Sequence, residues 1–167
     1  HLIGSYNVTN ALAAIAVGHH FGITADEAAK AIANYVPTNN RSEMVKTEHN
    51  ELIVDAYNAN PTSMKAALEN FARIPSAHKM CILGEMRELG LASAEEHKKV
   101  AEQALSLGCE EVWFVGEEFQ AYAEGGRWFP DVEAVKTALE GGDTPSNRLI
   151  LIKGSNGTKL YQLPTLL

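Results

Sequence analysis

A carboxylate and several amides follow a short apolar run in this sequence, where they could bind a nucleotide. Asp55 comes directly after Leu52-Ile53-Val54, and a carboxylate at the end of a strand can accept hydrogen bonds from two adjacent ribose hydroxyls. The run continues with the residues Tyr57, Asn58 and Asn60. Asp55 and Asn58 are also typical of a polar turn that satisfies its own backbone. An asparagine before Pro61 is equally typical of a helix cap, so the residue types alone favour a turn followed by a capped helix.

Two other apolar runs also end in polar residues, and all three ends should lie along one edge of a sheet. Residues 79–83 are followed by Gly84-Glu85-Met86-Arg87-Glu88, and residues 149–152 by Lys153-Gly154-Ser155-Asn156-Gly157. Lys153, Ser155 and backbone amides could form an anion site at a helix N-terminus, although glycine turns between a strand and a helix are common. Arg41 could reach a phosphate across a cleft and stabilise developing charge, or it could be an exposed surface arginine.

Several common kinds of site are absent from the sequence. Cys81 and Cys109 have no C-x-x-C spacing and the histidines show no H-x-x-x-H pattern, so we expect neither a disulfide framework nor a metal site. There is no G-x-x-x-x-G-K-[ST] or G-x-G-x-x-G motif, so a triphosphate cradle would have to lie outside this chain. A net charge of -7 without a basic cluster argues against nucleic acid as a partner. No apolar stretch approaches the roughly 20 residues of a membrane span, and a reducing, cytoplasmic location fits the free cysteines.

The first part of the chain is expected to form two helices. Apolar residues within 11–21 have the spacing of a buried helix face, and Gly22 would end that helix. Residues 24–27 have the pattern of a capping box, in which a threonine hydroxyl and a glutamate carboxylate satisfy the amides at a helix start. The second helix would run from there to about Tyr35.

Residues 37–40 are the expected hinge between segment 1–39 and segment 40–167, because a proline precedes three turn-forming residues. The elements expected after the hinge are strands over 44–48, 52–55, 79–83, 112–115 and 149–152, and helices that begin near residues 61, 93, 132 and 158. The helix near residue 93 would begin with a second capping box. Short strands that alternate with amphipathic helices predict an α/β fold with a mostly parallel sheet and helices on both faces.

Four segments have the spacing of motifs in one known family. Residues 4–14 resemble the motif G-x-[HY]-N-x-x-N-A-L-A-A, and Asn40-Arg41 resembles an arginine-bearing domain junction. Residues 55–61 resemble the motif D-x-Y-N-A-N-P. Residues 84–97 resemble the motif G-[DE]-M-x-E-L-G-x-x-S-x-x-x-H. On these motifs the chain resembles the Mur ligases along essentially its whole length. The run over residues 55–61 is the most specific of the four, because other branches of the family carry a histidine in it.

The resemblance implies an architecture and a reaction. Residues 1–39 would be a short helical remnant, the end of a central ATPase domain, and residues 40–167 a Rossmann-like C-terminal domain that closes over ATP. In the family, ATP phosphorylates a carboxylate, and an amine attacks the acyl phosphate because phosphate is a good leaving group. The implied cofactors are ATP and Mg²⁺, the latter held mainly by the central domain, and the implied partners are UDP-N-acetylmuramoyl-tripeptide and D-alanyl-D-alanine. This chain alone is expected to be inactive, and the enzyme to be a monomer.

The resemblance also implies which residues bind the nucleotide. Asn7 and Asn10 would lie near the adenine or the ribose, which Asp55 would bind. Arg41 would approach the γ-phosphate and act as a catalytic residue. The other nucleotide-binding residues would be Tyr57, Asn58 and Asn60.

The last strand end would serve the second substrate. By the same resemblance, Lys153 and Ser155 would hold the incoming dipeptide or the acyl phosphate, next to Asn156, where many relatives have arginine. Two alternatives stay open at this point. One is another amide ligase of the superfamily, of the folylpolyglutamate or cyanophycin synthetase type, against which the run over residues 57–61 argues. The other is a non-catalytic α/β binding module.

Overall fold

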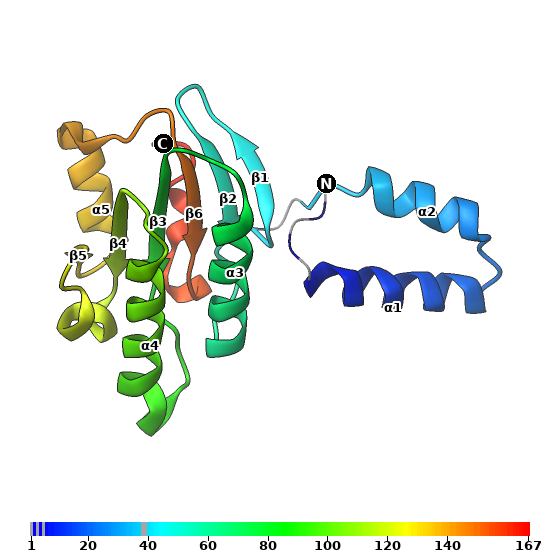
Figure 1. The fold of residues 1–167 in the computed structure, drawn as a ribbon, viewed down its shortest axis with the longest axis horizontal. Coiled ribbons are helices and arrows are strands. Elements are labelled where there is room, and N and C mark those ends of the chain that lie inside the picture. Colours follow the sequence, from blue (N-terminus) through cyan, green and yellow to red (C-terminus); the bar gives the residue numbers. More distant parts are fainter. Residues whose placement is uncertain (1, 3, 5, 38–39) are drawn as a thin grey trace.

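The chain folds into a helical hairpin followed by a sheet with helices on both faces (Figure 1). The computed structural model describes residues 2, 4, 6–37 and 40–167. The helices are α1 (Tyr6–His20), α2 (Ala25–Asn34), α3 (Pro61–Arg73), α4 (Ser93–Ser106) and α5 (Val132–Ala138). The strands are β1 (Glu43–Lys46), β2 (Glu51–Asp55), β3 (Lys79–Gly84), β4 (Glu111–Val115), β5 (Arg127–Phe129) and β6 (Leu149–Lys153). None of the described helices is long and apolar enough to cross a membrane.

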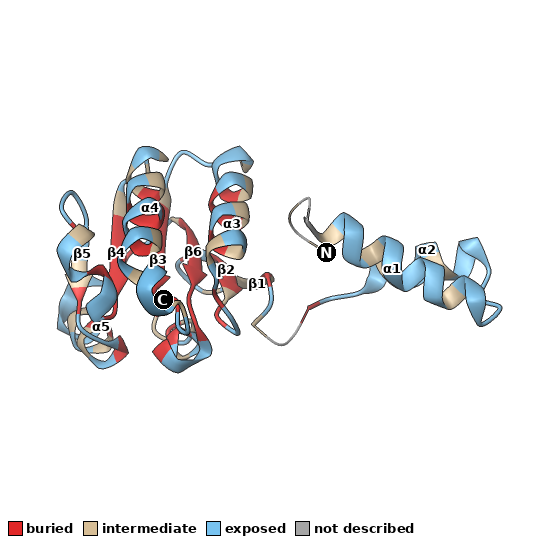
Figure 2. Cartoon of the chain, turned by 90° about the horizontal axis from the view of Figure 1, so that it is seen from below, coloured by how far each residue is buried: buried red, intermediate tan, exposed pale blue. Residues whose placement is uncertain are grey.

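The hairpin of α1 and α2 has the predicted turn at Gly22 and the predicted cap at Thr24, but α1 begins earlier than expected, at Tyr6, and is not buried as predicted. Thr24 caps α2: its hydroxyl accepts the Glu27 amide at 3.3 Å, and the Glu27 carboxylate accepts the Thr24 amide at 2.9 Å. Gly22 follows α1 with a φ of 86°, as expected of a glycine that ends a helix. The expectation of a buried face on α1 is wrong, because the contacts of α1 are mainly with α2 and large apolar side chains stay exposed (Figure 2). These exposed side chains are Val8, Leu12, Ile15, Val17 and Phe21.

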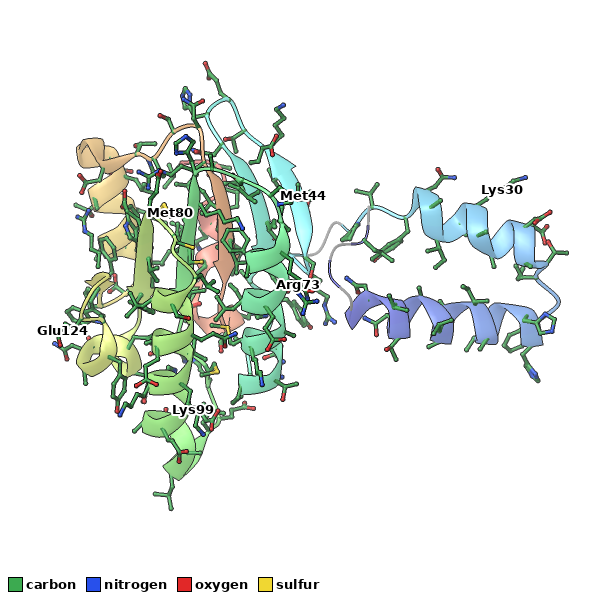
Figure 3. The ribbon with its side chains drawn as sticks, in the orientation of Figure 1. Lys30, Met44, Arg73, Met80, Lys99 and Glu124 are labelled. Carbon is green, nitrogen blue, oxygen red and sulfur yellow. The ribbon has the colours of Figure 1, made fainter. Side chains whose placement is uncertain are left out.

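The sheet has the order β1-β2-β6-β3-β4-β5, in which β1 is antiparallel to β2 and all other pairs are parallel. Helices α3 and α4 pack on one face through the cluster around Phe71 and Phe114, and α5 with the C-terminal segment packs on the other around Trp113. Met80 of β3 points into this packed interior, whereas Lys99 of α4 and Lys30 of α2 lie outside it (Figure 3). The predicted α/β fold with a mostly parallel sheet is confirmed.

The three polar strand ends meet at one edge of the sheet, as predicted. Lys153 at the end of β6 pairs with Asp55 at the end of β2 and with Leu83 near the end of β3. Because these strands are parallel neighbours, the loops that follow them leave the sheet side by side. The register therefore places residues 55–60, 84–88 and 153–157 on a common edge.

Two other predictions about helices are wrong, although α4 does begin at Ser93 as expected. Ser93 does not cap α4, which follows the 3₁₀ turn Gly90–Ala92; its hydroxyl bonds to the Glu118 carboxylate at 2.6 Å instead. The expected final helix over residues 158–163 is replaced by two 3₁₀ turns, Asn156–Thr158 and Leu160–Gln162. Lys159 between them has a left-handed backbone with a φ of 57°, which no α-helix tolerates.

Asn50 joins three segments at the opposite edge of the sheet. Its side chain is almost fully buried, and its Nδ2 donates to the carbonyl oxygens of Pro145 and Leu167. Its Oδ1 accepts the Arg148 amide at 3.1 Å. The turn between β1 and β2 is thereby tied to the start of β6 and to the C-terminal segment.

Replacing Asn50 with alanine should destabilise the sheet domain, because buried carbonyl and amide groups would lose their partners. We expect the free energy of unfolding to fall by about 2 kcal/mol for Asn50→Ala. Urea denaturation followed by circular dichroism measures this. Gln120→Ala, at an exposed position, is the control and should change the value by less than about 0.5 kcal/mol. Equal stabilities of the two variants would show that the Asn50 bonds contribute nothing.

Cys81 and Cys109 form a hydrogen-bonded thiol pair rather than a disulfide. Their sulfur atoms are 3.7 Å apart; Cys81 on β3 is buried and Cys109 before β4 is partly exposed. The hydrogen bond from Cys81 lowers the pKa of the Cys109 thiol, and the nearby Lys79 ammonium acts in the same direction. The same hydrogen bond, together with burial, raises the pKa of Cys81 well above its usual range. Cys109 is therefore the thiol that ionises first.

Because the thiolate is the reactive form, Cys109 should react with iodoacetamide faster than an ordinary exposed cysteine near neutral pH. Cys81→Ala removes the donor, so the pKa of Cys109 should rise and its alkylation should slow. Mass spectrometry of the alkylated protein over a pH series measures this rate. Cys81→Ser keeps a donor and should stay closer to the wild-type profile. An unchanged rate in Cys81→Ala would rule out this cause of the lowered pKa.

Candidate functional site

Asp55 and Lys153 meet at the ends of two neighbouring parallel strands. β2 pairs with β6 in a register that sets Asp55 opposite Lys153. The Lys153 Nζ donates hydrogen bonds to Asp55 Oδ2 at 2.7 Å and to the Asn58 carbonyl oxygen at 3.2 Å. The lysine side chain is 1% exposed and the aspartate side chain 17% exposed. The ammonium is therefore buried, and its charge is balanced by a carboxylate that still borders solvent.

The turn after Asp55 leads into α3 through a cap made by Asn60. The Asn60 Oδ1 accepts the Ser63 amide at 2.9 Å, and the Ser63 hydroxyl oxygen accepts the Asn60 amide at 3.1 Å. Pro61 stands in the first turn of the helix, where no amide donor is needed. The interpretation of Asn60 as a helix cap is confirmed. Its side-chain oxygen is engaged by α3, although the residue also borders the cleft described below.

The guanidinium of Arg41 stacks on the ring of Tyr57. The Arg41 Cζ lies 4.0 Å from the centre of the ring, and such a cation–π contact between exposed groups is worth about 0.5–1 kcal/mol. Arg41 is flanked by Asn40 and Ser42, whose φ angles of 55° and 52° are unusual for residues with a Cβ. The contact places an exposed cation next to the turn that carries Asp55.

A cleft of about 470 Å³ brings most of the predicted site residues together. One wall comes from α1, where the Asn10 side-chain amide donates to Asn7 Oδ1 at 3.1 Å. The other wall comes from the segment before β1, the β2 and β6 strand ends and the start of α3. The predicted residues that border the cleft are Asn7, Asn10, Arg41, Asp55, Tyr57, Asn58, Asn60 and Lys153. It therefore offers a carboxylate, side-chain amides, an aromatic ring and a cation to one ligand.

Ser155 is the predicted site residue that does not border this cleft. It is 5% exposed, and among the described residues its hydroxyl is the buried side-chain polar atom without a hydrogen-bond partner. Its backbone amide donates to the Glu85 carbonyl oxygen at 3.3 Å. A Cβ on Gly154 would lie 2.8 Å from the Gly84 Cα, so the two strand ends approach closely because both residues are glycines. Ser155 is thus held against the loop after β3 with an unused hydroxyl.

His97 fixes the loop after β3, a role that the sequence did not reveal. Its Nε2 accepts the Met86 amide at 2.9 Å, so the proton lies on Nδ1, which donates to the Ser93 carbonyl oxygen at 2.8 Å. The ring is fully buried and packs edge-on against Phe119. The neutral imidazole thus links the helix α4 to the edge of the sheet. Only its place in a family motif could have indicated this residue.

A second cavity, of about 210 Å³, lies at the same edge beside β4 and was not predicted. Both acidic and basic side chains border it, among them Arg87 and Glu85, which form an ion pair at 3.2 Å. The other charged residues that border it are Asp131, Glu133 and Lys159. These charged residues come from the segments after three different strands, β3, β5 and β6, so only the fold brings them together. The part of the chain that the structure describes contains no group of three His, Cys, Asp or Glu residues able to hold a metal ion.

The sequence and the fold of this chain both match those of known proteins. Residues 40–156 match the family described as Mur ligase, glutamate ligase domain. The UDP-N-acetylmuramoyl-tripeptide--D-alanyl-D-alanine ligase of Bacillus subtilis is 36% identical over 97% of this chain and 38% of its own length. The chain therefore spans less than half of this curated relative.

Solved structures agree with this assignment. MurF from Acinetobacter baumannii has a TM-score of 0.77 at 28% identity over 98% of this chain and 36% of its own. MurF ligase from Thermotoga maritima, solved in complex with ADP, has a TM-score of 0.79 over 98% of this chain and 38% of its own. At 20% identity, the second similarity shows the shared fold alone. From the match over residues 40–156, we conclude that the chain belongs to the Mur ligase family.

Proposed function

We propose that this chain is the C-terminal part of an ATP-dependent ligase that joins D-alanyl-D-alanine to UDP-N-acetylmuramoyl-tripeptide in the cytoplasm. The observation that carries the proposal is the cleft in which Asp55, Arg41 and Asn7 face one space. The name of the Bacillus subtilis relative supports this choice of substrates. Residues 1–39 would then end a central ATPase domain, and residues 40–167 would form the C-terminal domain of a monomeric enzyme.

The proposed nucleotide site divides ATP between the two walls of the cleft. Asn7 and Asn10 would bind the adenine or the ribose from α1, and Asp55 would accept hydrogen bonds from the ribose hydroxyls. Tyr57, Asn58 and Asn60 would line the space beside the ribose. The Thermotoga maritima ligase, which contains a domain of this fold, was solved in complex with ADP, and this supports an adenine nucleotide as a ligand of the full-length enzyme.

The proposed reaction follows from the chemistry of the two substrates. A carboxylate oxygen of the tripeptide attacks the γ-phosphorus of ATP, which gives an acyl phosphate and ADP. The dipeptide amine then attacks the carbonyl carbon and inorganic phosphate leaves, which avoids direct attack on an unactivated carboxylate. Arg41 would leave the Tyr57 ring and stabilise the charge that develops on the γ-phosphate. The described residues offer no cluster for Mg²⁺, so we assign it to the part of the enzyme outside this chain.

Ser155 is proposed to bind the dipeptide or the acyl phosphate. A buried hydroxyl without a partner is costly, and a ligand oxygen or amine at the edge of the sheet would satisfy it. Asn156 is exposed next to it and leaves this position without the charge of an arginine. Lys153 already donates its ammonium to Asp55 and to the Asn58 carbonyl oxygen, which argues against a direct contact with the same substrate.

The test is an assay of the full-length ligase with ATP, UDP-N-acetylmuramoyl-tripeptide and D-alanyl-D-alanine, in which released phosphate and product are measured. Arg41→Ala should lower kcat about 100-fold, because a cation is lost from the developing charge. Arg73→Ala, at the exposed end of α3, is the matched control and should keep wild-type kinetics.

Three results would contradict the proposal at different levels. Turnover with a folate and glutamate in place of the named substrates would favour the folylpolyglutamate type. No ligation with either substrate pair would favour a non-catalytic module. Full activity of Arg41→Ala would show that Arg41 has no role in the reaction, and the proposed substrates would still stand.

A further inference from the structure

Lys153 is placed unlike a residue that binds a ligand. Two of its three ammonium protons are used within the chain, by Asp55 Oδ2 at 2.7 Å and by the Asn58 carbonyl oxygen at 3.2 Å. The side chain is 1% exposed, so the charge is almost completely removed from water. Moving such an ammonium onto a phosphate would leave the carboxylate and the carbonyl without it. Its contacts are those of an internal support.

Lys153 contacts only one of the two carboxylate oxygens of Asp55. Among the described residues, Oδ2 receives the Lys153 ammonium and Oδ1 has no hydrogen-bond partner. The carboxylate borders the cleft, and Oδ1 is therefore the oxygen left for a ligand. A carboxylate with one oxygen fixed loses most of its freedom to rotate, so less entropy is lost when a ligand binds the other.

The same ammonium sets the path of the turn after β2. Its bond to the Asn58 carbonyl oxygen joins the turn to β6. Asn58 and Lys153 are 95 residues apart in the chain. Tyr57, which carries the Arg41 guanidinium, lies in that turn between Asp55 and Asn58. One lysine thus supports both the carboxylate and the aromatic side chain on this wall of the cleft.

From these contacts we propose that Lys153 is a positioning residue, which fixes the Asp55 carboxylate so that Oδ1 meets the ribose hydroxyls, and which does not touch the nucleotide itself. The inference rests on the proposed nucleotide site and changes the role of Lys153 within it. A merely structural lysine would affect stability alone. A lysine that acts through Asp55 must also affect how strongly the enzyme prefers a nucleotide with ribose hydroxyls.

The experiment compares ATP with 2′,3′-dideoxy-ATP in the full-length ligase and its Lys153→Met variant. Methionine keeps an unbranched apolar side chain and removes the charge, and the unpaired Asp55 can be hydrated from the cleft that it borders. We expect KM for ATP to rise roughly tenfold, the loss of one hydrogen bond to a charged group, with kcat little changed. KM for the dideoxy nucleotide should hardly change, so the preference for ATP should disappear.

Asp55→Asn and Lys79→Met are the matched comparisons. Asp55→Asn keeps an acceptor for Lys153 but loses the charge that binds the hydroxyls, so it should lose the same preference. Lys79 also donates to two carbonyl oxygens, those of Phe71 and Ala72, but at the other edge of the sheet. Lys79→Met should lower the melting temperature and keep the wild-type preference for ATP.

A double variant makes the test independent of the stability of Lys153→Met. Removing both members of a buried pair is tolerated better than removing one, so Asp55→Asn with Lys153→Met should fold. If Lys153 acts only through Asp55, the second substitution should leave KM for ATP within about twofold of Asp55→Asn alone. A further rise of roughly tenfold would mean that Lys153 contacts the nucleotide, and the inference would be wrong.

The outcomes separate this inference from the proposed function. Loss of the preference in Asp55→Asn but not in Lys153→Met would overturn the positioning role and keep the nucleotide site. An equal fall in kcat with both nucleotides in Lys153→Met would place the lysine on the transferred phosphoryl group and also overturn it. Wild-type preference in Asp55→Asn would overturn the nucleotide site itself, and the inference with it.

Discussion

The ammonium of Lys153 has almost no contact with water. The arrangement of the sheet edge that carries the proposed nucleotide site depends on how that charge is balanced. A buried cation is stable only beside a matching charge with good geometry. Here the match requires that β2 and β6 pair in the register that sets Asp55 opposite Lys153. A slip of one residue would turn the lysine to the other face of the sheet and would also exchange the apolar side chains between the two cores. The ion pair and the hydrophobic packing therefore specify the same register.

The other loops of this edge are held by contacts that need particular residue types. A Cβ on Gly154 would meet the Gly84 Cα, and a Cβ on Gly84 would meet the side chains of Thr158 and Leu160. Beside them, the neutral imidazole of His97 accepts the Met86 amide and joins the loop after β3 to α4. The Ser155 hydroxyl lies among these fixed groups and has no hydrogen-bond partner in the described part of the chain. An unsatisfied hydroxyl in a rigid surrounding is suited to a ligand, because little needs to move when it binds.

The sequence predicted local features well and long-range ones poorly. The capping box at Thr24, the helix cap at Asn60 and the succession of the main strands along the chain follow from residues close in the chain, although the capping box expected at Ser93 does not form. The three-residue strand β5 is too short to show a period, and the turns around Lys159 depend on a left-handed backbone that a lysine does not indicate. The burial of Lys153 was missed because its partners lie 95 and 98 residues away. A lysine followed by a glycine-containing turn has the sequence pattern of a residue that binds an anion, and only the strand pairing shows that its ammonium is engaged within the chain.

The two walls of the cleft differ in how they are supported. Asp55 and Arg41 belong to the sheet domain, where register, an ion pair and a cation–π contact hold the turn. Asn7 and Asn10 belong to α1, whose contacts within this chain are mainly with α2 and whose apolar side chains are largely exposed. In the proposed function, the ribose and phosphate contacts thus come from a wall that this chain supports fully. The Asn7 and Asn10 contacts to the adenine or the ribose come from a wall whose position depends on what packs against the hairpin, so a nucleotide in the cleft would couple the placement of the two walls.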